Sequence, residues 1–356
     1  MKKILFVGPK FNPPTGGVAF VLREYKKLYP NARFVASTNS KNNLTKIFGF
    51  LFGFIHYVFL LTTQPNIQIV HIHGASYNSF TRKYLIYKLA KLFNKKVIYH
   101  IHGAEYQFFY EKSNQKIKKQ IQNFINNTDC LICLSESWKM FFEQEFTPRR
   151  IEIIPNIIEN PNVIPQKKVF ASNTLKFLFL GYIDKRKGVW LLLDTLRKHK
   201  TEVEGKAVFY IGGNGEINRL QNLIKEYHLG NMVKYIGWVS GEEKQRQLNE
   251  ADIYLLPSFN EGLPISILEA MSYSLPILST TVGGIPEIID NSNGILIEPG
   301  NEEQLWKAIE YFVNAEEIIL DIMGQASKEK IKQHLPVEVR KKLNELYQNL
   351  IFENIS

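Results

Sequence analysis

The chain has 356 residues, a length that predicts two domains, each large enough to bury its own core. Hydrophobic residues make up 45% and charged residues 22% of the sequence, which excludes a disordered or fibrous protein. Two cysteines exclude a disulfide framework, and the N-terminal apolar stretch from Ile4 to Val7 is too short for a signal peptide. We therefore expect a protein of the reducing cytoplasm.

The net charge of +10 is unevenly distributed along the chain. Up to Pro165 there are 22 Lys and Arg residues against 9 Asp and Glu, whereas from Gln166 onward there are 22 against 25. A basic first half suggests an anionic partner for that half alone: nucleic acid, an anionic membrane or a phosphorylated substrate. A solvated basic surface is the alternative. Because the sequence holds no recognisable nucleic-acid-binding module, we expect no nucleic-acid partner.

Short apolar runs alternate with helix-like segments through both halves, which predicts an α/β protein with two doubly wound parallel sheets. The expected strands are Ile4 to Gly8, Ile67 to His73, Lys96 to His102, Cys130 to Ser135, Leu175 to Gly181, Ala207 to Gly212, Val233 to Gly237, Ile253 to Pro257 and Pro276 to Thr280. Between the halves, Pro155 to Pro165 has three prolines and three asparagines, a linker composition. We therefore expect domains at residues 1–160 and 166–336.

The segment from Leu256 to Met271 is the most informative motif. A strand is expected to end at Pro257, a loop carries Glu261 and Gly262, and Pro264 suits a first helical turn. Free backbone N–H groups at such a helix start favour an anion such as a diphosphate, and Gly262 permits its close approach. Glu269, about 7.5 Å further along the helix axis, could reach a pair of sugar hydroxyls. Two unrelated surface carboxylates are the alternative.

This pair of glutamates resembles the Glu, seven residues, Glu signature of retaining glycosyltransferases of the GT-B fold, particularly glycosyltransferase family 4. Further segments resemble family motifs in the family's order, so that the resemblance spans nearly the whole chain. They are Gly16 to Val18, Tyr99 to Gly103, Cys133 to Glu136, Ile154 to Asn156, Gly181 to Gly188, Gly212 to Gly215, Tyr235 to Val239 and Val282 to Glu287.

The resemblance implies a GT-B enzyme with two Rossmann-like domains facing across a cleft. Such a hexosyltransferase moves a sugar, with retention, from a UDP- or GDP-linked donor to an acceptor hydroxyl. The acceptor is expected to be a lipid-linked or growing cell-surface polysaccharide or lipopolysaccharide. The first domain would hold the acceptor and the second the donor, and the last helix, about 337–356, would pack back on the first domain.

The same resemblance implies the site residues of the second domain. Lys187, with help from Arg186, would bind the diphosphate; a solvated basic turn is the alternative. Glu269 would hold the ribose hydroxyls, and Glu261 would hold the transferred sugar. The backbone positions expected to contact the donor are Gly237, Val239, Gly262, Leu263, Pro264 and Ile265.

The first domain would contribute a histidine and a glycine pair. His102 is implied to contact the donor sugar near the reacting carbon, and Gly16 with Gly17 to lie against the diphosphate. A structural histidine and a simple turn are the alternatives. The sequence departs from the family at Tyr182, where an arginine is usual after the glycine. That departure motivates a second hypothesis, a catalytically silent subunit that binds and activates a partner.

We expect neither a metal nor a cofactor. The sequence has no Asp-x-Asp motif for a metal clamp, and Cys130 and Cys133 would point to opposite faces of a strand. The His71-x-His73 and His100-x-His102 pairs lack an accompanying carboxylate or cysteine set, so zinc is not expected. Gly212 to Gly215 lacks the spacing of a dinucleotide-binding loop.

Two helices of the basic half could lie on a membrane. The near-apolar run from Ile47 to Leu61 is shorter than the roughly 20 residues that a spanning helix needs, so it predicts a buried or membrane-surface helix. Between Arg82 and Lys96, one helical face would carry lysines and another leucines, typical of a helix on an anionic membrane or of a helix with its leucines in the core. The lysines are Lys88, Lys91 and Lys95, and the leucines are Leu85, Leu89 and Leu92. Peripheral binding to the inner face of the cell membrane is therefore expected as an alternative to a purely cytoplasmic location.

Overall fold

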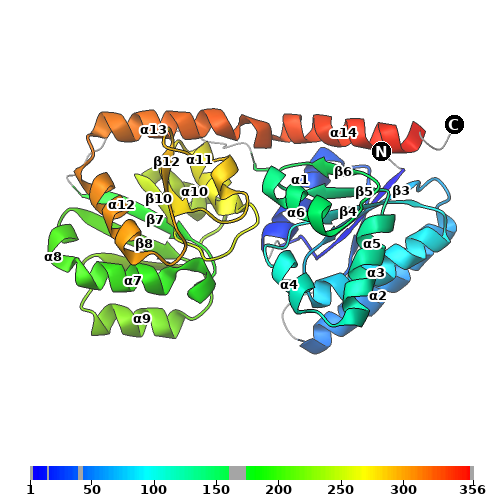
Figure 1. The fold of residues 1–356 in the computed structure, drawn as a ribbon, viewed down its shortest axis with the longest axis horizontal. Helices are drawn as coiled ribbons and strands as arrows, with labels where there is room; N and C mark the ends of the chain where they lie inside the picture. The colour runs from blue at the N-terminus through cyan, green and yellow to red at the C-terminus, as the bar shows by residue number, and fades with distance from the viewer. Residues whose placement is uncertain (1–2, 14–15, 39–42, 160–173, 353–356) are drawn as a thin grey trace. The chain divides into compact units, whose positions relative to one another are not determined.

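The computed structural model describes residues 3–13, 16–38, 43–159 and 174–352. The chain divides into two compact units (Figure 1). Unit 1 comprises Met1–Ile158 with His334–Ser356, and unit 2 comprises Glu159–Gln333. Residues 160–165 of the expected linker lie outside the described residues.

Unit 1 is built on a six-stranded parallel sheet in the order β2-β1-β3-β4-β5-β6. Its strands are β1 (Ile4–Gly8), β2 (Arg33–Ala36), β3 (Ile69–Gly74), β4 (Lys96–Ile101), β5 (Cys130–Cys133) and β6 (Ile151–Ile153). Its helices are α1 (Gly17–Leu28), α2 (Asn43–Thr63), α3 (Asn78–Leu92), α4 (Tyr106–Lys112), α5 (Gln115–Asn127), α6 (Glu136–Glu145) and α14 (Pro336–Phe352).

Unit 2 repeats this architecture with a parallel sheet in the order β12-β11-β10-β7-β8-β9. Its strands are β7 (Leu175–Leu180), β8 (Ala207–Gly212), β9 (Val233–Gly237), β10 (Ile253–Leu256), β11 (Ile277–Thr280) and β12 (Gly294–Ile297). Its helices are η1 (Lys185–Lys187), α7 (Val189–Lys198), α8 (Lys200–Val203), α9 (Ile217–Glu226), α10 (Gly241–Glu250), α11 (Ile265–Ser272), η2 (Ile285–Glu287), α12 (Glu302–Asn314) and α13 (Glu317–Lys330).

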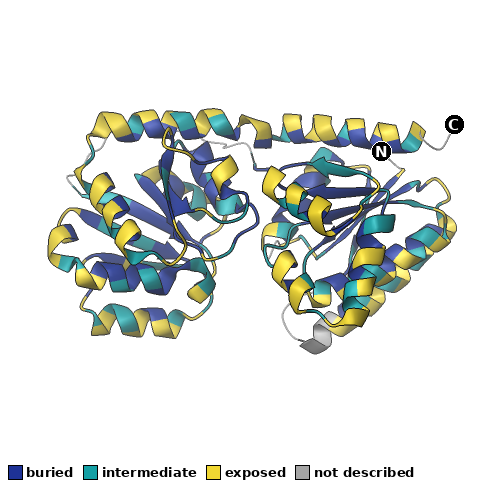
Figure 2. Cartoon of the chain, viewed as in Figure 1, coloured by how far each residue is buried: buried dark blue, intermediate teal, exposed yellow. Residues whose placement is uncertain are grey.

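The central strands of both sheets are buried because helices cover both faces (Figure 2). The prediction of two doubly wound parallel sheets is therefore confirmed. Strands β2, β6 and β12 were not among the expected strands. Within the described part of the chain, no helix combines the length and apolar character needed to cross a bilayer.

The C-terminal helix α14 packs on unit 1. It follows the short helix η3 (Ile331–His334), where the chain passes from unit 2 back to unit 1. The Tyr347 hydroxyl lies 2.8 Å from Nδ1 of His71 on β3, and the Tyr29 hydroxyl donates to the side-chain oxygen of Asn344 at 3.0 Å. Apolar residues of α14, among them Leu343 and Leu350, are buried. These contacts tie the end of the chain to the first unit.

Of the two alternatives for the leucines of α3 (Asn78–Leu92), the one that places all three in the core does not hold for Leu85 and Leu92. Leu85 is 47% exposed and Leu92 is 75% exposed. The face of α3 that meets the sheet is instead formed by Phe80, Lys83, Ile86, Tyr87 and Ala90. Two aromatic rings and a β-branched residue fill that side, so Leu85 and Leu92 point outward, whereas Leu89 packs partly against the core. The helix also ends at Leu92, and Lys95 lies beyond it.

Candidate functional site

A buried carboxylate lies in the loop after β10 of unit 2. Glu261 is only 5% exposed, and its Oε1 accepts a hydrogen bond from the ammonium of Lys187 at the end of η1. The Ser258 hydroxyl donates to the same oxygen at 2.8 Å. Nη1 of Arg186 lies 3.9 Å from the other oxygen, Oε2. One carboxylate therefore organises two cations within a single small region.

Two glycines in the left-handed region fix this loop from either side. A Cβ on Gly188, whose φ is +76°, would lie 1.9 Å from the Pro257 carbonyl oxygen. A Cβ on Gly283, whose φ is +57°, would lie 2.1 Å from the Glu261 carbonyl oxygen. Main-chain hydrogen bonds add to the fixation, with the Phe259 N–H donating to the Arg186 carbonyl at 2.8 Å. Only glycine permits these close approaches.

The loop leads directly into helix α11. Pro264 has an extended ψ of 122° and lies immediately before the first helical residue, Ile265, so it is not within the first turn as the sequence suggested. This places Pro264 as the cap, where its missing N–H costs nothing. The first N–H groups of an α-helix have no partner within the helix and attract anions. Gly262 and the buried Leu263 lie between Glu261 and this helix start.

Glu269 lies on α11, about one turn beyond the helix start at Ile265. Its Oε1 accepts a hydrogen bond from the ammonium of Lys244 on α10, and both side chains remain partly accessible. A carboxylate held by a lysine at a partly open position can exchange part of that contact for ligand hydroxyls. Cations at Arg186 and Lys187, a helix start and a second carboxylate thus suit a ligand with a diphosphate and a hydroxyl pair.

The remaining positions expected to contact the donor, Gly237 and Val239, lie at the end of β9 and just after it. Gly237 adopts a φ of +76° and its carbonyl accepts from the Gly213 N–H at 2.8 Å. Val239 is buried, whereas the indole of Trp238 between them is 55% exposed. Tyr182, at the departure from the family pattern, is also exposed just after β7. Both aromatic side chains thus extend into solvent.

Four histidines of unit 1 stack along the neighbouring strands β3 and β4. His102 follows the end of β4, and its Nε2 lies 2.9 Å from Nδ1 of His73, while its ring stacks on His100 with centroids 4.1 Å apart. Burial lowers the pKa of His102 to about 4, which a hydrogen bond with Asn156 partly opposes. His102 is therefore neutral near pH 7 and offers one donor and one acceptor.

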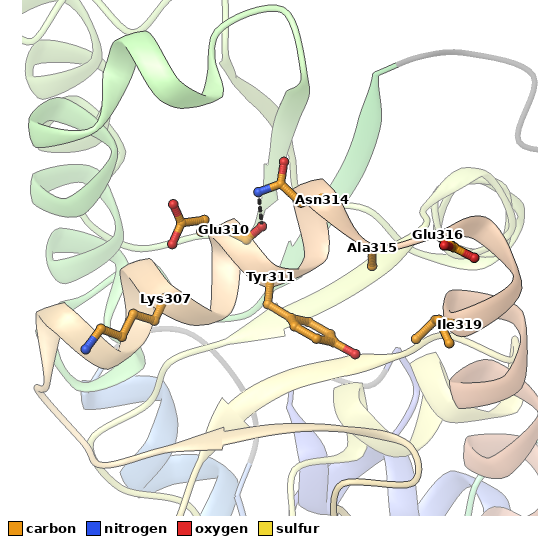
Figure 3. A pocket seen from close by; sticks show the side chains of 7 residues that line it. All are labelled: Lys307, Glu310, Tyr311, Asn314, Ala315, Glu316 and Ile319. Atoms are coloured by element: carbon orange, nitrogen blue, oxygen red, sulfur yellow. Dashed lines mark hydrogen bonds between the residues drawn. The ribbon is translucent and has the colours of Figure 1, made fainter.

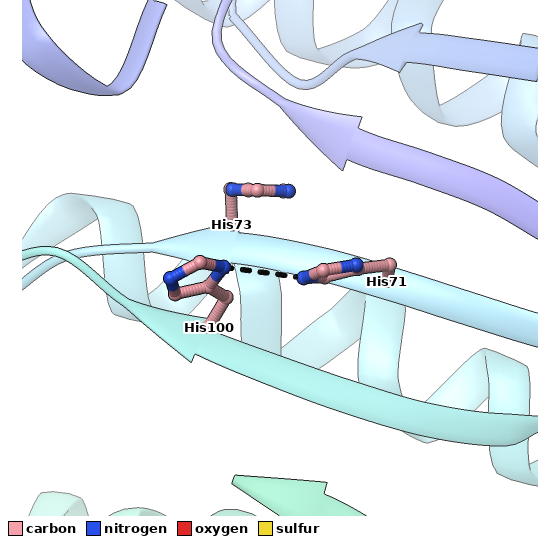
Figure 4. A group of neighbouring side chains, drawn as sticks. All are labelled: His71, His73 and His100. Atoms are coloured by element: carbon pink, nitrogen blue, oxygen red, sulfur yellow. Dashed lines mark hydrogen bonds between the residues drawn. The ribbon is translucent and has the colours of Figure 1, made fainter. Parts of the chain in front are cut away.

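Three of these histidines, His71, His73 and His100, bring ring nitrogens within 4.8 Å of one another (Figure 4). Nε2 of His71 lies 3.3 Å from Nδ1 of His100. The His71 and His73 rings, however, stack with centroids 4.4 Å and planes 15° apart. Zinc binds in the plane of an imidazole at about 2 Å, and two stacked rings cannot both direct a lone pair at one ion. In this arrangement the trio is a packed cluster.

Cys130 and Cys133 are both buried free thiols at the two ends of β5. Burial raises the pKa of both, that of Cys133 to about 12, so neither is a ready thiolate.

A shallow groove in unit 2 lies between α12 and α13 (Figure 3). Its lining residues are Lys307, Glu310, Tyr311, Asn314, Ala315, Glu316 and Ile319. None of these belongs to the loop, η1 or α11, which carry the charged cluster around Glu261. We therefore assign the groove no part in that cluster.

Gly16 and Gly17 stand at the start of α1 in unit 1. Gly16 has a φ of +145°, and a Cβ built on it would meet no atom within 4 Å. The conformation favours glycine, and a side chain would protrude into open space.

Sequence reasoning missed the partners that hold the expected residues. Ser258 lies three residues before Glu261, a local spacing that could have been noticed. Lys244 is 25 residues from Glu269 and Asn156 is far from His102, so nothing in the sequence pattern pairs them.

Two family descriptions match this chain in tandem. Glycosyl transferases group 1 matches residues 162–330, and Glycosyltransferase Family 4 matches residues 18–160. The chain belongs to the group 1 glycosyltransferases. In this group 1 glycosyltransferase, the group 1 match includes Arg186, Lys187, Glu261 and Glu269. The Family 4 match includes His102, whereas Gly16 and Gly17 precede it.

The group 1 glycosyltransferase has relatives in lipid and polysaccharide glycosylation. It is 26% identical over 263 residues to the GPI3 subunit of phosphatidylinositol N-acetylglucosaminyltransferase from Saccharomyces cerevisiae, covering 70% of this chain and 56% of the yeast protein. It is 32% identical over 142 residues to the amylovoran biosynthesis glycosyltransferase AmsK from Erwinia amylovora, covering 38% of this chain and 35% of AmsK. The chain thus matches about half or less of these relatives' lengths.

HepE from Anabaena, solved in complex with UDP, has the same fold. The match has a TM-score of 0.78 and 17% identity and covers 98% of this chain and 100% of HepE. The predicted GT-B fold, two Rossmann-like domains, is thereby confirmed.

Proposed function

We propose that this protein transfers a hexose from a nucleotide diphosphate sugar to an acceptor hydroxyl. The observation that carries the proposal is the cluster in unit 2, where Lys187, Arg186 and the start of α11 surround the buried Glu261. Cationic side chains and a helix start stabilise a diphosphate as it departs and gains negative charge. HepE is named as a UDP complex, which favours UDP over GDP as the nucleotide.

Each residue has a distinct proposed role. Lys187 and Arg186 bind the diphosphate, and Glu269 accepts hydrogen bonds from the ribose hydroxyls. Glu261, with the backbone of Gly262 to Ile265, holds the transferred sugar and the phosphates. The backbone at Gly237 and Val239 contacts the base.

Unit 1 supplies two further proposed contacts. His102 is neutral near pH 7 and can donate to or accept from a sugar hydroxyl. Gly16 and Gly17 approach the diphosphate, which the open space around Gly16 permits.

The transfer retains the anomeric configuration in this proposal. The acceptor oxygen bonds to the anomeric carbon on the face from which the diphosphate departs, and the departing phosphate oxygen takes the acceptor proton. The residues then supply position and charge stabilisation rather than a general base. Neither step needs a metal ion, so EDTA should leave the rate unchanged. Loss of activity in EDTA with recovery in Mn²⁺ would contradict this part.

The acceptor is proposed to be a lipid-linked or growing cell-surface polysaccharide. Support comes from the names of the relatives, one acting in amylovoran biosynthesis and one belonging to a phosphatidylinositol glycosyltransferase. A product of defined linkage formed on a lipid-linked oligosaccharide, absent with the lipid-free sugar, would support this choice.

A catalytically silent subunit is the second candidate, because Tyr182 stands where the family has a cation. The two candidates differ in donor turnover. Purified protein is incubated with UDP-glucose, UDP-N-acetylglucosamine, UDP-galactose and GDP-mannose, and release of the nucleotide is measured. An enzyme releases one nucleotide and loses this activity in Glu261→Gln, while the exposed α12 variant Lys307→Met retains it. No release with any donor, even with acceptor present, would favour the silent subunit.

A further inference from the structure

Helix α2 carries an apolar stripe that the fold of unit 1 leaves uncovered. We define the stripe as Ile47, Phe48, Leu51, Phe52, Ile55 and Phe59, each at least half exposed. Each of them has another member of the stripe three or four residues away, which places them along one side of a helix of 21 residues, about 30 Å long. Isolated exposed apolar residues are ordinary, but six on one helix mark an interaction surface.

The opposite side of α2 is fixed against the sheet, so the stripe cannot turn inward. A Cβ on Gly53 would lie 2.0 Å from the carbonyl oxygen of Ala36 on β2, which shows how closely the helix approaches. Further along the same side, Tyr57 is fully buried and its hydroxyl donates to the Ile86 carbonyl of α3 at 3.0 Å. Rotating the stripe into the core would break these contacts.

The charge of the surrounding chain identifies the partner. From Tyr25 to Ala104, a stretch that includes α2 and α3, the sequence has 11 Lys and Arg residues and no Asp or Glu. Unit 1 as a whole has 25 Lys and Arg against 11 Asp and Glu, whereas unit 2 has 19 against 23. A second copy of so basic a surface would be repelled, but an anionic bilayer would be attracted.

Basic side chains lie where they could meet lipid headgroups. Gln64 and Pro65 come directly after α2 in the chain, and each accepts a hydrogen bond from a basic side chain. Arg33 on β2 donates to the Gln64 side-chain oxygen at 2.9 Å, and Lys95 donates to the Pro65 carbonyl at 3.4 Å. On the neighbouring helix α3, the exposed Lys88 lies between the exposed Leu85 and Leu92. Apolar side chains combined with lysines and arginines are typical of helices that lie in the bilayer interface.

We propose that unit 1 binds the surface of anionic membranes by inserting the α2 stripe among the lipid acyl chains, parallel to the bilayer plane. Large side chains on such helices reach about 5–10 Å into the interface, while nearby lysines and arginines contact anionic headgroups. This interaction is independent of sugar transfer, so its test uses lipid binding rather than catalysis.

Flotation with lipid vesicles tests the proposal. The full chain is mixed with phosphatidylcholine vesicles containing about 30% phosphatidylglycerol, and with pure phosphatidylcholine vesicles. We expect the protein to float with the anionic vesicles and to bind the neutral ones less. In the double variant Phe52→Ser and Ile55→Ser the partition coefficient should fall at least about tenfold, because two inserted side chains are removed.

A matched control comes from unit 2. Ile318 and Ile322 on α13 are each 56% exposed, as is Ile55, but belong to the less basic unit. The double variant Ile318→Ser and Ile322→Ser should float like the wild type. All four positions are exposed, so both variants should unfold at the wild-type temperature. Equal loss of flotation in the two variants, or no flotation of the wild type, would overturn the proposal.

A site-directed probe gives a second readout. An environment-sensitive thiol dye is attached to Phe52→Cys, or to Ile322→Cys as control, since native Cys130 and Cys133 are buried. Anionic vesicles should shift the emission to the blue only at position 52. No shift there would overturn the proposal. A dimer in sedimentation velocity that the α2 variant abolishes, without vesicle binding, would overturn it in favour of a contact between copies.

Discussion

The ammonium of Lys187 donates to the carboxylate of Glu261, a residue 74 positions later in the chain. The pair joins the end of η1 to the loop after β10, so it fixes two expected donor-binding segments relative to each other. The side chains are only 12% and 6% exposed. The interaction therefore contributes both to the stability of unit 2 and to the proposed chemistry.

A double-mutant cycle separates these two contributions. Lys187→Met leaves the buried Glu261 carboxylate without its closest cation, and should lower the free energy of unfolding by about 2–4 kcal/mol. Adding Glu261→Gln removes the unpaired charge and should recover most of that loss, measured by urea unfolding. Nucleotide release should remain absent in the double variant. Recovery of activity together with stability would mean that the pair is only structural.

The role of Glu269 can be tested with nucleotides that lack ribose hydroxyls. Wild-type protein should bind UDP at least about tenfold more tightly than 2′,3′-dideoxy-UDP, because hydrogen bonds to a charged carboxylate are lost. Glu269→Gln should bind both nucleotides with similar, weaker affinity in calorimetric titrations. If Glu269→Gln still discriminated between them to the wild-type degree, another group would recognise the ribose.

Tyr182 stands where the family has an arginine, so we expect substitutions at Arg186 and at Tyr182 to change UDP binding by different amounts. Arg186 already lies beside Glu261, so Arg186→Ala should weaken UDP binding by about tenfold through loss of a charge-assisted contact. Tyr182→Arg adds a cation at an exposed position and should strengthen binding by a few-fold at most. Tighter binding in Arg186→Ala would show that this arginine does not serve the diphosphate.

The buried histidines make unit 1 sensitive to acid. Burial lowers the pKa of His71, His73 and His100 well below the usual value and that of His102 to about 4. Below pH 6.5 these histidines become protonated in the unfolded chain, whereas in the native state they stay neutral. The free energy of unfolding therefore falls as the pH decreases toward 4. Each such histidine contributes a slope of about 1.4 kcal/mol per pH unit in this window.

The variant His100→Phe removes one of these groups without removing a stacked ring. The free energy of unfolding, measured between pH 6.5 and pH 4.5, should then depend less steeply on pH than in the wild type. An unaltered slope in His100→Phe would mean that this histidine is already protonated in the native state.

The sequence predicted the sheets and the candidate residues better than it predicted their surroundings. Long apolar runs such as Lys96 to His102 specify buried strands, whereas β6 is three residues long and has no distinctive pattern. Chain order also located Glu261 in a loop and Glu269 on the helix that follows it. It could not pair Lys244 with Glu269, because that contact depends on how α10 and α11 pack.

The property hardest to predict was which face of a helix packs against the core. Leucine spacing on α3 left open whether Leu85 and Leu92 face a membrane or the core, and the side chains that pack in the core are Phe80, Ile86 and Tyr87. Which apolar face packs inward depends on the volume available over β3 and β4. The sequence of one helix does not contain that information. The same limit left the exposure of α2 open until the fold was known.

Thermal unfolding in the presence of nucleotides tests the central claim most directly. UDP, GDP, ADP and CMP are compared at equal concentration, since a ligand that binds only the native state raises the unfolding temperature. We predict stabilisation by one nucleoside diphosphate, UDP before GDP, and its loss in the Lys187→Met and Glu261→Gln double variant. No stabilisation by any of the four, or an equal shift in the double variant, would contradict the assignment of this cluster as the donor site.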